Sequence, residues 1–460
     1  MAEDFNLKRD KTFRSIYNLY FMLYFFVGIL PVNIDNLLIN LPGTTKFGIG
    51  IVIASSLVIG IVSILTFGYL GEKISEKFTR KKLFSITNLC WILAYGSLSF
   101  SLNYNFYLIF YIFAAIGTGA FLPLGFAIIG DLYSPKERGS KFGVMQFGLL
   151  LGNGLGIILG GLLGSYTGPN GWRYAYVLGF ILGILSLINF IRKGVEPERG
   201  RSEPEFADFK GEIDYNYKIT FHNLIRLFKV KSIIAILISV LASGIASSTL
   251  GNWAIYYLTL KIGSSDGGFY ATTIYLLAGM GALPGTIVGG RLGDSLFRAD
   301  KPKGRVLVSL LGLLLGISFM FSFYLVPFFT TTISQVIFSW IIFILLGLIA
   351  YFFTSFSIGN QFAIYSELCV PELRSTTNAL NGLMINIGGI IGNLLLSSLI
   401  ERNLSWLPFA IFLVLLIWLL GSLLWVIPYF YYTKDSQICR ELMAERRKEM
   451  DQKKVDLSNS

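Results

Sequence analysis

The sequence predicts an all-α membrane protein in which twelve transmembrane helices form two six-helix repeats. Only 14% of the 460 residues are charged and 54% are apolar, whereas average chains carry about 25% charged residues. Apolar runs long enough to cross roughly 30 Å of hydrocarbon recur along the whole chain. A group of residues that starts at Asp131 also returns 236 positions later, at Glu367. This recurrence indicates an internal duplication.

The duplicated segments share an acid, a proline, an arginine and two glycines in one frame. In the first copy these are Asp131, Pro135, Arg138, Gly152 and Gly156, and in the second Glu367, Pro371, Arg374, Gly388 and Gly392. Each copy has an acid that ends one membrane helix, a proline turn, an arginine and a glycine-rich helix that returns through the bilayer. Five matches in one frame are hard to obtain by chance, so we expect two similar halves.

The apolar runs define twelve predicted spans and a simple domain order. The spans lie roughly at 15–40, 47–71, 83–103, 107–131, 141–165, 172–192, 232–259, 268–292, 305–327, 332–366, 375–400 and 407–432. Some exceed the ~20 residues that a perpendicular helix needs, which implies tilt or extension beyond the bilayer. The predicted domains are an N-terminal arm (1–14), a six-helix bundle (15–192), a linker with an amphipathic helix (193–231), a second bundle (232–432) and a basic tail (433–460).

The basic residues predict the orientation. With the amino terminus inside, all but four of the 38 Lys and Arg residues fall on one side, the exceptions being Lys46, Arg173, Lys261 and Arg402. This asymmetry predicts that both termini are cytoplasmic, in a multi-pass protein of the cell membrane. Topology and anionic inner-leaflet lipid explain the net charge of +11, so we expect no nucleic-acid partner. Trp172 beside Arg173 fits an anchor at the outer interface.

Several classes of function are excluded by missing residue types. The three cysteines are scattered and the only histidine, His222, lies in the linker, so neither a disulfide framework nor a multi-histidine metal site is expected. There is no Walker-type loop, and no nucleophile with a base can be assembled within the membrane. We therefore expect no cofactor and no enzymatic activity, and we expect a monomer.

The first predicted span carries Pro31 and Asp35. Asp35 is the only carboxylate well within any predicted span, and burying it without a partner would be costly. Asp35 is therefore expected to line a cavity, with ion coupling as one of its roles. The alternative is that Asp35 lies hydrated at the outer interface, or caps the end of a helix that is broken at Pro31.

Two loops place an acid and an arginine at helix ends that are expected to be cytoplasmic. A carboxylate there can face the positive end of a neighbouring helix while the arginine ties the loop down. The loops GYLGEKISEKFTRKK and GGRLGDSLFR supply Gly68, Glu72, Glu76, Arg80, Gly290, Asp294 and Arg298. Glu76 has the same spacing to Arg80 as Asp294 has to Arg298, and Glu72 is the alternative acid. These pairs are expected to form a cytoplasmic gate together with Asp131, Arg138, Glu367 and Arg374. The alternative is that each loop is only a solvated basic loop.

The fifth predicted span contains a glycine every fourth residue. Its stripe consists of Gly148, Gly152, Gly156, Gly160 and Gly164. Missing side chains along one stripe let another helix approach closely and also permit rocking. We therefore assign these glycines to helix packing and movement, not to ligand contact.

Uncharged polar and aromatic residues in the spans are candidates for the substrate cavity. They are Gln146, Asn153, Asn252, Trp253, Tyr256, Tyr275, Gln361, Tyr365, Asn378 and Asn381. Each alone also fits an interhelical hydrogen bond. Together they describe a lining with amides and aromatic rings but little charge, which suits an amphiphilic molecule with a modest polar head.

Several stretches carry a resemblance to a known family. The two acid-plus-arginine loops, with DLYSPKERG and ELCVPELRS, resemble the major facilitator superfamily of transporters over the whole chain. Within it, VNIDN, GDLYSPKERGSKFGVMQFGLLLGNGLG, GWRYAYVLG, STLGNWAIYYL and VPELRSTTNALNGLMINIGG resemble the Spinster-like branch. That branch commonly has an arginine and a glutamate in helix four, but YIFAAIGTGAFLP has no charge. Asp35 is thus left as the main candidate for coupling.

The resemblance implies a function that agrees with the composition. We expect a secondary active or facilitative transporter that works by alternating access, with a lysolipid or sphingoid-type amphiphile as the implied cargo. One alternative is a proton-linked exporter of drugs or other organic solutes. A second is a membrane protein that senses a ligand, or scrambles lipid, without coupled turnover.

Overall fold

The computed structural model describes residues 2–72, 79–133, 135–168, 170–197, 230–263, 267–329, 331–369 and 371–441. No strand occurs in these ranges, and they contain twelve helical segments long and apolar enough to cross a membrane. This confirms the predicted all-α fold class. The chain divides into two compact units, and each is described by itself. The linker and its expected amphipathic helix lie mostly outside the described residues, so the predicted domain boundaries stay predictions.

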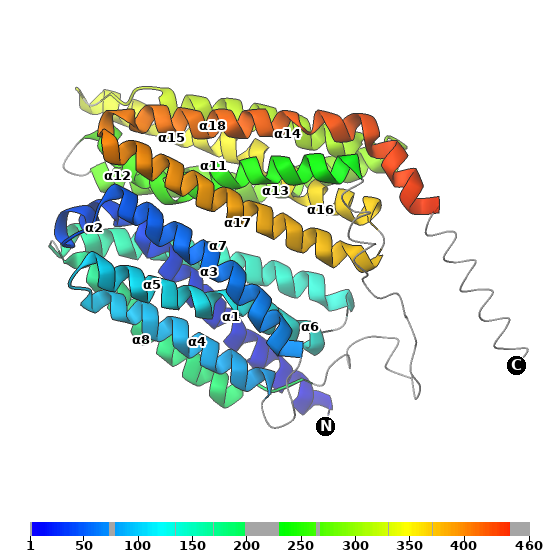
Figure 1. The fold of residues 1–460 in the computed structure, drawn as a ribbon, viewed down its shortest axis with the longest axis horizontal. Coiled ribbons are helices and arrows are strands. Elements are labelled where there is room, and N and C mark those ends of the chain that lie inside the picture. The colour runs from blue at the N-terminus through cyan, green and yellow to red at the C-terminus, as the bar shows by residue number, and fades with distance from the viewer. Residues whose placement is uncertain are drawn as a thin grey trace, which may run out of the picture. The chain divides into compact units, whose positions relative to one another are not determined.

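The first unit comprises residues 1–214, 250–273 and 393–407 (Figure 1). Its complete helices are α1 (Ala2–Val32), α2 (Ile34–Asn40), α3 (Lys46–Glu72), α4 (Arg80–Ser97), α5 (Tyr104–Gly119), α6 (Ala127–Leu132), α7 (Pro135–Tyr166) and α8 (Gly171–Lys193). Short helical turns, η1 (Leu98–Phe100) and η2 (Leu122–Phe126), extend α4 and join α5 to α6. The N-terminal six predicted spans thus correspond to helices of this unit.

The second unit comprises residues 215–249, 274–392 and 408–460. Its helices are α11 (Lys231–Ile262), α12 (Gly267–Gly279), α13 (Ala282–Arg298), α14 (Gly304–Leu325), α15 (Ile333–Thr354), α16 (Phe356–Leu368), α17 (Pro371–Arg402) and α18 (Leu407–Leu423), with a turn, η3 (Leu404–Trp406), before α18. Residues 426–441 are also helical. Four of these helices have residues in both units: α11, α12 and α17, and also α18, of which only Leu407 belongs to the first unit.

Several of the described spans are interrupted, which the hydropathy pattern does not predict. A π-helical turn that contains Pro123 separates α5 from α6, because proline lacks the N–H that continues an α-helix. The eighth span breaks between α12 and α13 at Met280, and the tenth breaks between α15 and α16 at Ser355. Interrupted spans like these line the sites of many transporters.

The first span ends earlier than predicted. The structure ends α1 at Val32 and places Asp35 in the first turn of the short helix α2. Pro31 and the non-helical backbone of Asn33 (φ −113°, ψ 13°) account for the break. The expectation that Asp35 lies well within the first span is therefore wrong, because the candidate span covers Leu7–Val32.

Aromatic side chains fill the core of the first unit. Phe26 stacks on Tyr95 with ring centroids 5.0 Å apart, and the hydroxyl groups of Tyr107 and Tyr176 are hydrogen-bonded at 2.7 Å. Trp172 is fully buried and packs edge-on against Tyr107 and Tyr176. The interpretation of Trp172 as an interfacial anchor is therefore wrong: the indole is part of the core.

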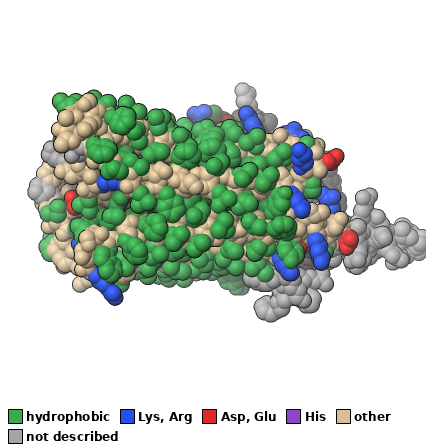
Figure 2. All heavy atoms as spheres, turned by 90° about the horizontal axis from the view of Figure 1, so that it is seen from above, with side chains coloured by type: hydrophobic (Ala, Val, Ile, Leu, Met, Phe, Trp, Pro, Cys, Tyr) green, Lys and Arg blue, Asp and Glu red, His purple; other side chains and the backbone are tan. Residues whose placement is uncertain are grey.

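The surface fits a lipid environment. Figure 2 shows hydrophobic side chains over most of this face and most of its Lys and Arg side chains toward the right of the view. Many large apolar side chains are exposed, among them Leu65 and Ile333, whose exposed fractions are 69% and 82%. In a membrane such side chains contact acyl chains, and only helices or closed barrels satisfy their backbone groups there.

Candidate functional site

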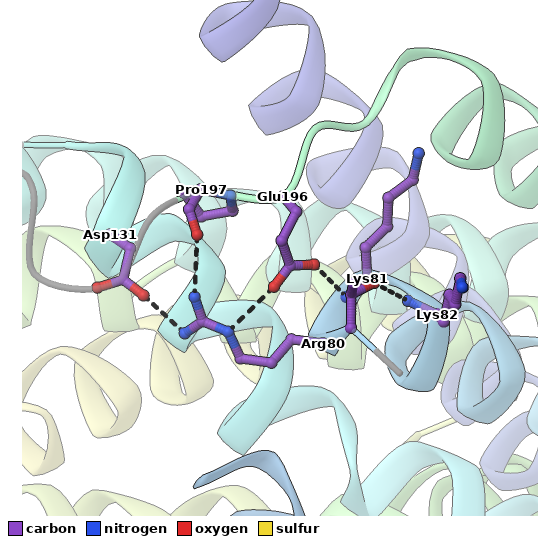
Figure 3. Close-up of polar contacts among 7 residues, drawn as sticks. Arg80, Lys81, Lys82, Asp131, Glu196 and Pro197 are labelled. Atoms are coloured by element: carbon purple, nitrogen blue, oxygen red, sulfur yellow. Dashed lines mark hydrogen bonds and ion pairs between the residues drawn. The ribbon is translucent and has the colours of Figure 1, made fainter. Parts of the chain in front are cut away.

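Arg80 is the centre of a buried polar cluster in the first unit (Figure 3). Thr79 caps α4 by accepting a hydrogen bond from the Lys82 backbone N–H at 3.3 Å, which fixes Arg80 as the first residue of the helix. The Arg80 side chain is only 7% exposed. Its Nη1 donates to Asp131 Oδ2 at 2.6 Å and its Nε donates to Glu196 Oε1 at 3.3 Å. One guanidinium therefore joins the start of α4 to the end of α6 and to the chain after α8.

The second carboxylate oxygen of Glu196 also binds the N-terminal end of α4. The Lys81 backbone N–H donates to Glu196 Oε2 at 2.6 Å, while Arg80 Nη2 donates to the carbonyl of Pro197 at 3.3 Å (Figure 3). A carboxylate at a helix N-terminus is stabilised by the unpaired N–H groups and the helix dipole. The segment that follows α8 is thus fastened to α4 by three hydrogen bonds.

Arg305 holds the equivalent position in the second unit. It lies in the first turn of α14, with its side chain 14% exposed, and pairs with Asp294 at 2.7 Å and with Glu367. The Tyr432 hydroxyl donates to the other oxygen of Glu367. The Arg305 guanidinium also lies 4.3 Å from the centre of the Phe297 ring, a cation–π distance.

The two arginine clusters are copies of one arrangement. Asp131 and Glu367 are separated by 236 positions, and so are Glu196 and Tyr432, which bond the corresponding arginine or its acid. Arg80 is the first residue and Arg305 the second residue of the helix that follows the repeated loop. Each half therefore groups an arginine, the acid near the end of its fourth span and a residue that follows α8 in the first unit or α18 in the second.

Part of the expected gate takes a different form. Among the described residues, exposed Arg298 donates from Nε only to its own helix, at the Asp294 carbonyl (3.3 Å), while the Asp294 carboxylate pairs with Arg305. The expected side-chain pair of Asp294 with Arg298 is therefore absent here. Arg305, Glu196 and Tyr432 were not predicted, although the 236-residue repeat applied to Glu196 leads to Tyr432.

The remaining gate residues contribute little to the described geometry. A Cβ at Gly290 would meet nothing within 4 Å, and one at Gly68 would meet only Pro123, at 3.8 Å. Four expected gate groups lie outside the described residues or side chains: Glu72, Glu76, Arg138 and Arg374. In the part of the chain that the structure describes, no three His, Cys, Asp or Glu residues are grouped so that they could hold a metal ion.

The Asp35 side chain is exposed on α2. Partial burial by neighbouring chain nevertheless raises the pKa of this carboxyl group, because desolvation disfavours its charged form. Asp35 lies close enough to Tyr256 of α11 for the two side chains to interact electrostatically. This geometry fits the alternative of a carboxylate at the end of a broken first span.

The other polar candidates of the first unit differ in exposure. Trp253 is fully buried and its Nε1 donates to Asn393 Oδ1 at 3.1 Å, so it connects α11 to α17. Tyr256 is also buried, edge-on to Trp253 at 5.9 Å. Gln146 is exposed, while the remaining two are half-buried: Asn153 and Asn252. Asn393, which sequence reasoning missed, directly follows the repeated Gly392.

In the second unit, three candidates form one hydrogen-bonded group. Gln361 Nε2 donates to Tyr365 Oη at 3.3 Å and to Asn381 Oδ1, and the Tyr365 hydroxyl donates to the same Asn381 oxygen at 3.0 Å. This polar triad joins α16 to α17. Tyr275 lies apart, edge-on to Tyr351 at 6.5 Å, and Asn378 is exposed.

The glycine stripe of α7 packs against the first span. A Cβ at Gly152 would collide with the carbonyl of Phe21, and one at Gly156 with the carbonyl of Phe25. Gly148 faces Tyr17, Gly160 faces Val32 and Gly164 faces Asn33. Asn33 also donates from Nδ2 to the Gly160 carbonyl at 3.1 Å. The stripe thus lets the two backbones touch at Gly152 and Gly156 and keeps α7 close to its neighbour from Gly148 to Gly164.

The second half repeats this contact between α11 and α17. A Cβ at Gly388 would collide with the carbonyl of Leu241, and one at Gly392 with the carbonyl of Ile245. These carbonyls lie 220 positions after those of Phe21 and Phe25. The same two spans of each half are therefore in backbone contact.

The ends of α3 and α17 meet in the first unit. The Phe47 backbone N–H, in the first turn of α3, donates to Glu401 Oε2 at 3.0 Å. A Cβ at Gly50 would collide with the Ser397 hydroxyl and would lie 3.1 Å from the carbonyl of Asn393. We call this contact of Phe47 and Gly50 with Asn393, Ser397 and Glu401 the α3–α17 contact; it was not predicted.

A duplicated bundle of twelve membrane helices, with an arginine cluster in each half, defines a class of integral, multi-pass membrane transport proteins. A sequence profile described as the Major Facilitator Superfamily matches residues 16–392. The chain therefore belongs to the major facilitator superfamily, and it is a transporter and not an enzyme.

Curated relatives cover parts of the chain. Protein spinster homolog 3 of Danio rerio is 25% identical over 250 residues, 51% of this chain and 48% of the relative. Multidrug resistance protein 3 of Bacillus subtilis is 30% identical over 165 residues, which are 36% of this chain and 30% of the relative. Sphingosine-1-phosphate transporter SPNS2 of Mus musculus is 28% identical over 196 residues, which are 42% of this chain and 33% of the relative. Each match spans less than half of the relative's own length.

A solved structure agrees over nearly the whole chain. The crystal structure of a bacterial homolog to the human lysosomal transporter Spinster, in an inward-facing and unoccupied conformation, gives a TM-score of 0.70. The match covers 94% of this chain and 98% of that chain at 17% identity, which shows a shared fold. Family, relatives and fold together support the Spinster-like branch.

Proposed function

We propose that this protein carries an amphiphilic or lipid-like small molecule across the membrane by alternating access, as a secondary active or facilitative transporter. The observation that carries the proposal is the duplicated arginine cluster, Arg80 with Asp131 in one half and Arg305 with Glu367 in the other. Ionic clusters at corresponding helix ends can break and reform as two halves rock about a central site.

The polar candidates favour an amphiphile. None of the buried or half-buried candidates on α7, α11, α16 and α17 is charged, and highly charged metabolites need ionic partners. The relative named as a sphingosine-1-phosphate transporter is consistent with a lipid-like cargo. The relative named as a multidrug resistance protein favours a second candidate function, a proton-linked exporter of drugs or other organic solutes.

We also propose a cell-membrane location with both termini in the cytoplasm, and a monomeric protein. The support for the orientation is that all but four of the 38 basic residues fall on one side of the predicted topology. Tags at the two ends should be accessible only from the cytoplasmic side of sealed cells.

The test is accumulation of a labelled single-chain amphiphile in sealed vesicles, with and without an imposed pH gradient. We expect uptake or efflux to depend on the protein in both cases, and to exceed equilibrium only with the gradient if protons are coupled. Asp35→Asn should then abolish the gradient-driven part, because Asp35 has a raised pKa and can exchange a proton. Accumulation that Asp35→Asn leaves unchanged would exclude Asp35 as the coupling group.

Two results would favour the other functions. Gradient-driven export of drugs without movement of single-chain amphiphiles would favour the multidrug exporter. Ligand binding with no flux, or lipid movement that never responds to a gradient, would favour a sensor or a scramblase.

A further inference from the structure

The polar triad of Gln361, Tyr365 and Asn381 uses up most of its own hydrogen-bonding capacity. Gln361 Nε2 has two N–H groups, and both donate within the triad. Asn381 Oδ1 has two lone pairs, and it accepts from both Gln361 and Tyr365. A side-chain amide has one carbonyl oxygen and one NH2 group. The atoms left over are therefore the Gln361 Oε1 acceptor and the Asn381 Nδ2 donor.

These two atoms are not sealed inside the protein. Gln361 is half-buried and Asn381 is 4% exposed. Among the described residues, neither atom belongs to the buried polar atoms that lack a hydrogen-bond partner. Both atoms therefore keep some accessible surface, while Tyr365, the third member of the triad, is 1% exposed and supports them. A ligand that binds at the triad meets one acceptor, Gln361 Oε1, and one donor, Asn381 Nδ2, both held in place by the hydrogen bonds of the triad.

Few charged residues lie near the triad on its own two helices. On α16 the only charged residue is Glu367, which is already paired with Arg305. On α17 there is no charged residue from 375 to 400. A phosphate needs several N–H donors or a cation, and a carbonyl acceptor beside it repels it. An ammonium group would need a free carboxylate to compensate its loss of water.

We propose that the triad binds the head of the substrate and selects an uncharged group that both donates and accepts a hydrogen bond, such as a hydroxyl or a primary amide. A hydroxyl donates to Gln361 Oε1 and accepts from Asn381 Nδ2, so it satisfies both atoms without breaking the triad. This inference rests on the proposed transport of amphiphiles and narrows their head group. It separates this chain from a carrier of phosphate-bearing lipids.

The experiment uses the full-length protein in sealed proteoliposomes and alkyl chains of one fixed length that end in a hydroxyl, an amide, an ammonium or a phosphate group. Each compound competes against uptake of the labelled hydroxyl form. We expect the hydroxyl and amide compounds to compete at least tenfold better than the phosphate and ammonium compounds. A phosphate or ammonium compound that competes equally well would overturn the proposal.

Variants then locate the selectivity. Gln361→Ala should weaken the hydroxyl and amide compounds about fivefold, the loss of one hydrogen bond, and leave the charged compounds unchanged. Gln361→Glu should reverse the order in favour of ammonium. Ile358→Ala is the matched control, since Ile358 is 48% exposed on α16, one turn before Gln361, and it should keep the wild-type order.

The outcomes separate this inference from the proposed function. If uptake still prefers neutral head groups in Gln361→Ala, the triad is not the origin of that preference. The proposed transport function would be unaffected by this result. If no compound of any head group is moved, the proposed function fails and this inference fails with it. The wild-type series decides the preference even if a variant does not fold.

Discussion

At the scale of single residues, two arginines join helix ends that are far apart in sequence. A guanidinium offers five N–H donors in a planar fork, which lets Arg80 reach Asp131, Glu196 and Pro197 together. The sequence predicted Asp131 and Glu367 through the repeat. The sequence did not predict that Arg305 pairs with Glu367. Spacing along a chain identifies neighbours on one helix, whereas these contacts connect the ends of several helices.

Arg305→Lys should lower the melting temperature in detergent and reduce transport. A lysine offers one point charge and cannot bridge Asp294 and Glu367 as the fork does. Leaving the partly buried Glu367 without its ionic partner costs about 1–3 kcal/mol. The measurement is thermal unfolding beside vesicle uptake.

Arg298→Lys is the matched control for Arg305→Lys. Its side chain is exposed and bonds only a carbonyl of its own helix, so we expect stability within about 0.5 kcal/mol of the wild type. If Arg298→Lys were the more damaging of the two, the sequence-based pairing of Asp294 with Arg298 would be right after all.

At the scale of helices, composition and periodicity predict which segments span and which faces touch. The glycine spacing of α7 predicted close helix packing, and the structure adds the partner, since Gly152 and Gly156 lie on the carbonyls of α1. The break at Met280 lies four residues before Pro284, which cannot donate the helical hydrogen bond to the Met280 carbonyl, so this break has a local cause. The break at Ser355 has no proline near it, so it depends on tertiary packing that no local pattern encodes.

Gly156→Ala should destabilise the protein by about 1–3 kcal/mol, the usual effect of overpacking a tight contact. The added Cβ would collide with the Phe25 carbonyl, and α1 and α7 would have to separate. Thermal unfolding and amphiphile uptake should both decrease.

The same substitution at Gly60 supplies the comparison. A Cβ at Gly60 meets nothing within 4 Å, and alanine favours a helix over glycine by up to about 1 kcal/mol. Gly60→Ala should therefore be neutral or slightly stabilising. A loss of stability as large as that of Gly156→Ala would mean that the stripe itself has no special role.

At the scale of the whole molecule, duplication was readable from the sequence but the grouping of helices was not. The first compact unit takes in residues 250–273 and 393–407 of the C-terminal half. The α3–α17 contact lies in this unit, where Glu401 accepts from the Phe47 N–H. Neither residue belongs to a repeated motif, so sequence alone gives no reason to pair them.

Glu401→Gln should speed hydrogen exchange of the amides in the first turn of α3. Removing a carboxylate from a helix N-terminus costs about 0.3–1 kcal/mol, so exchange should rise by up to about fivefold at Phe47. Arg402→Gln, which changes the adjacent exposed residue, should leave this exchange unaltered. Equal acceleration by both variants would refute a specific role for Glu401.

The continuity of α17 has a mechanical consequence. After its first residue the helix contains no proline, and it extends unbroken from Pro371 to Arg402. Asn381 and Glu401 therefore lie on one continuous helix, about 30 Å apart at 1.5 Å per residue. A rigid-body tilt or shift of α17 that starts at Glu401 would therefore also displace the Asn381 amide, which links the α3–α17 contact mechanically to the polar triad.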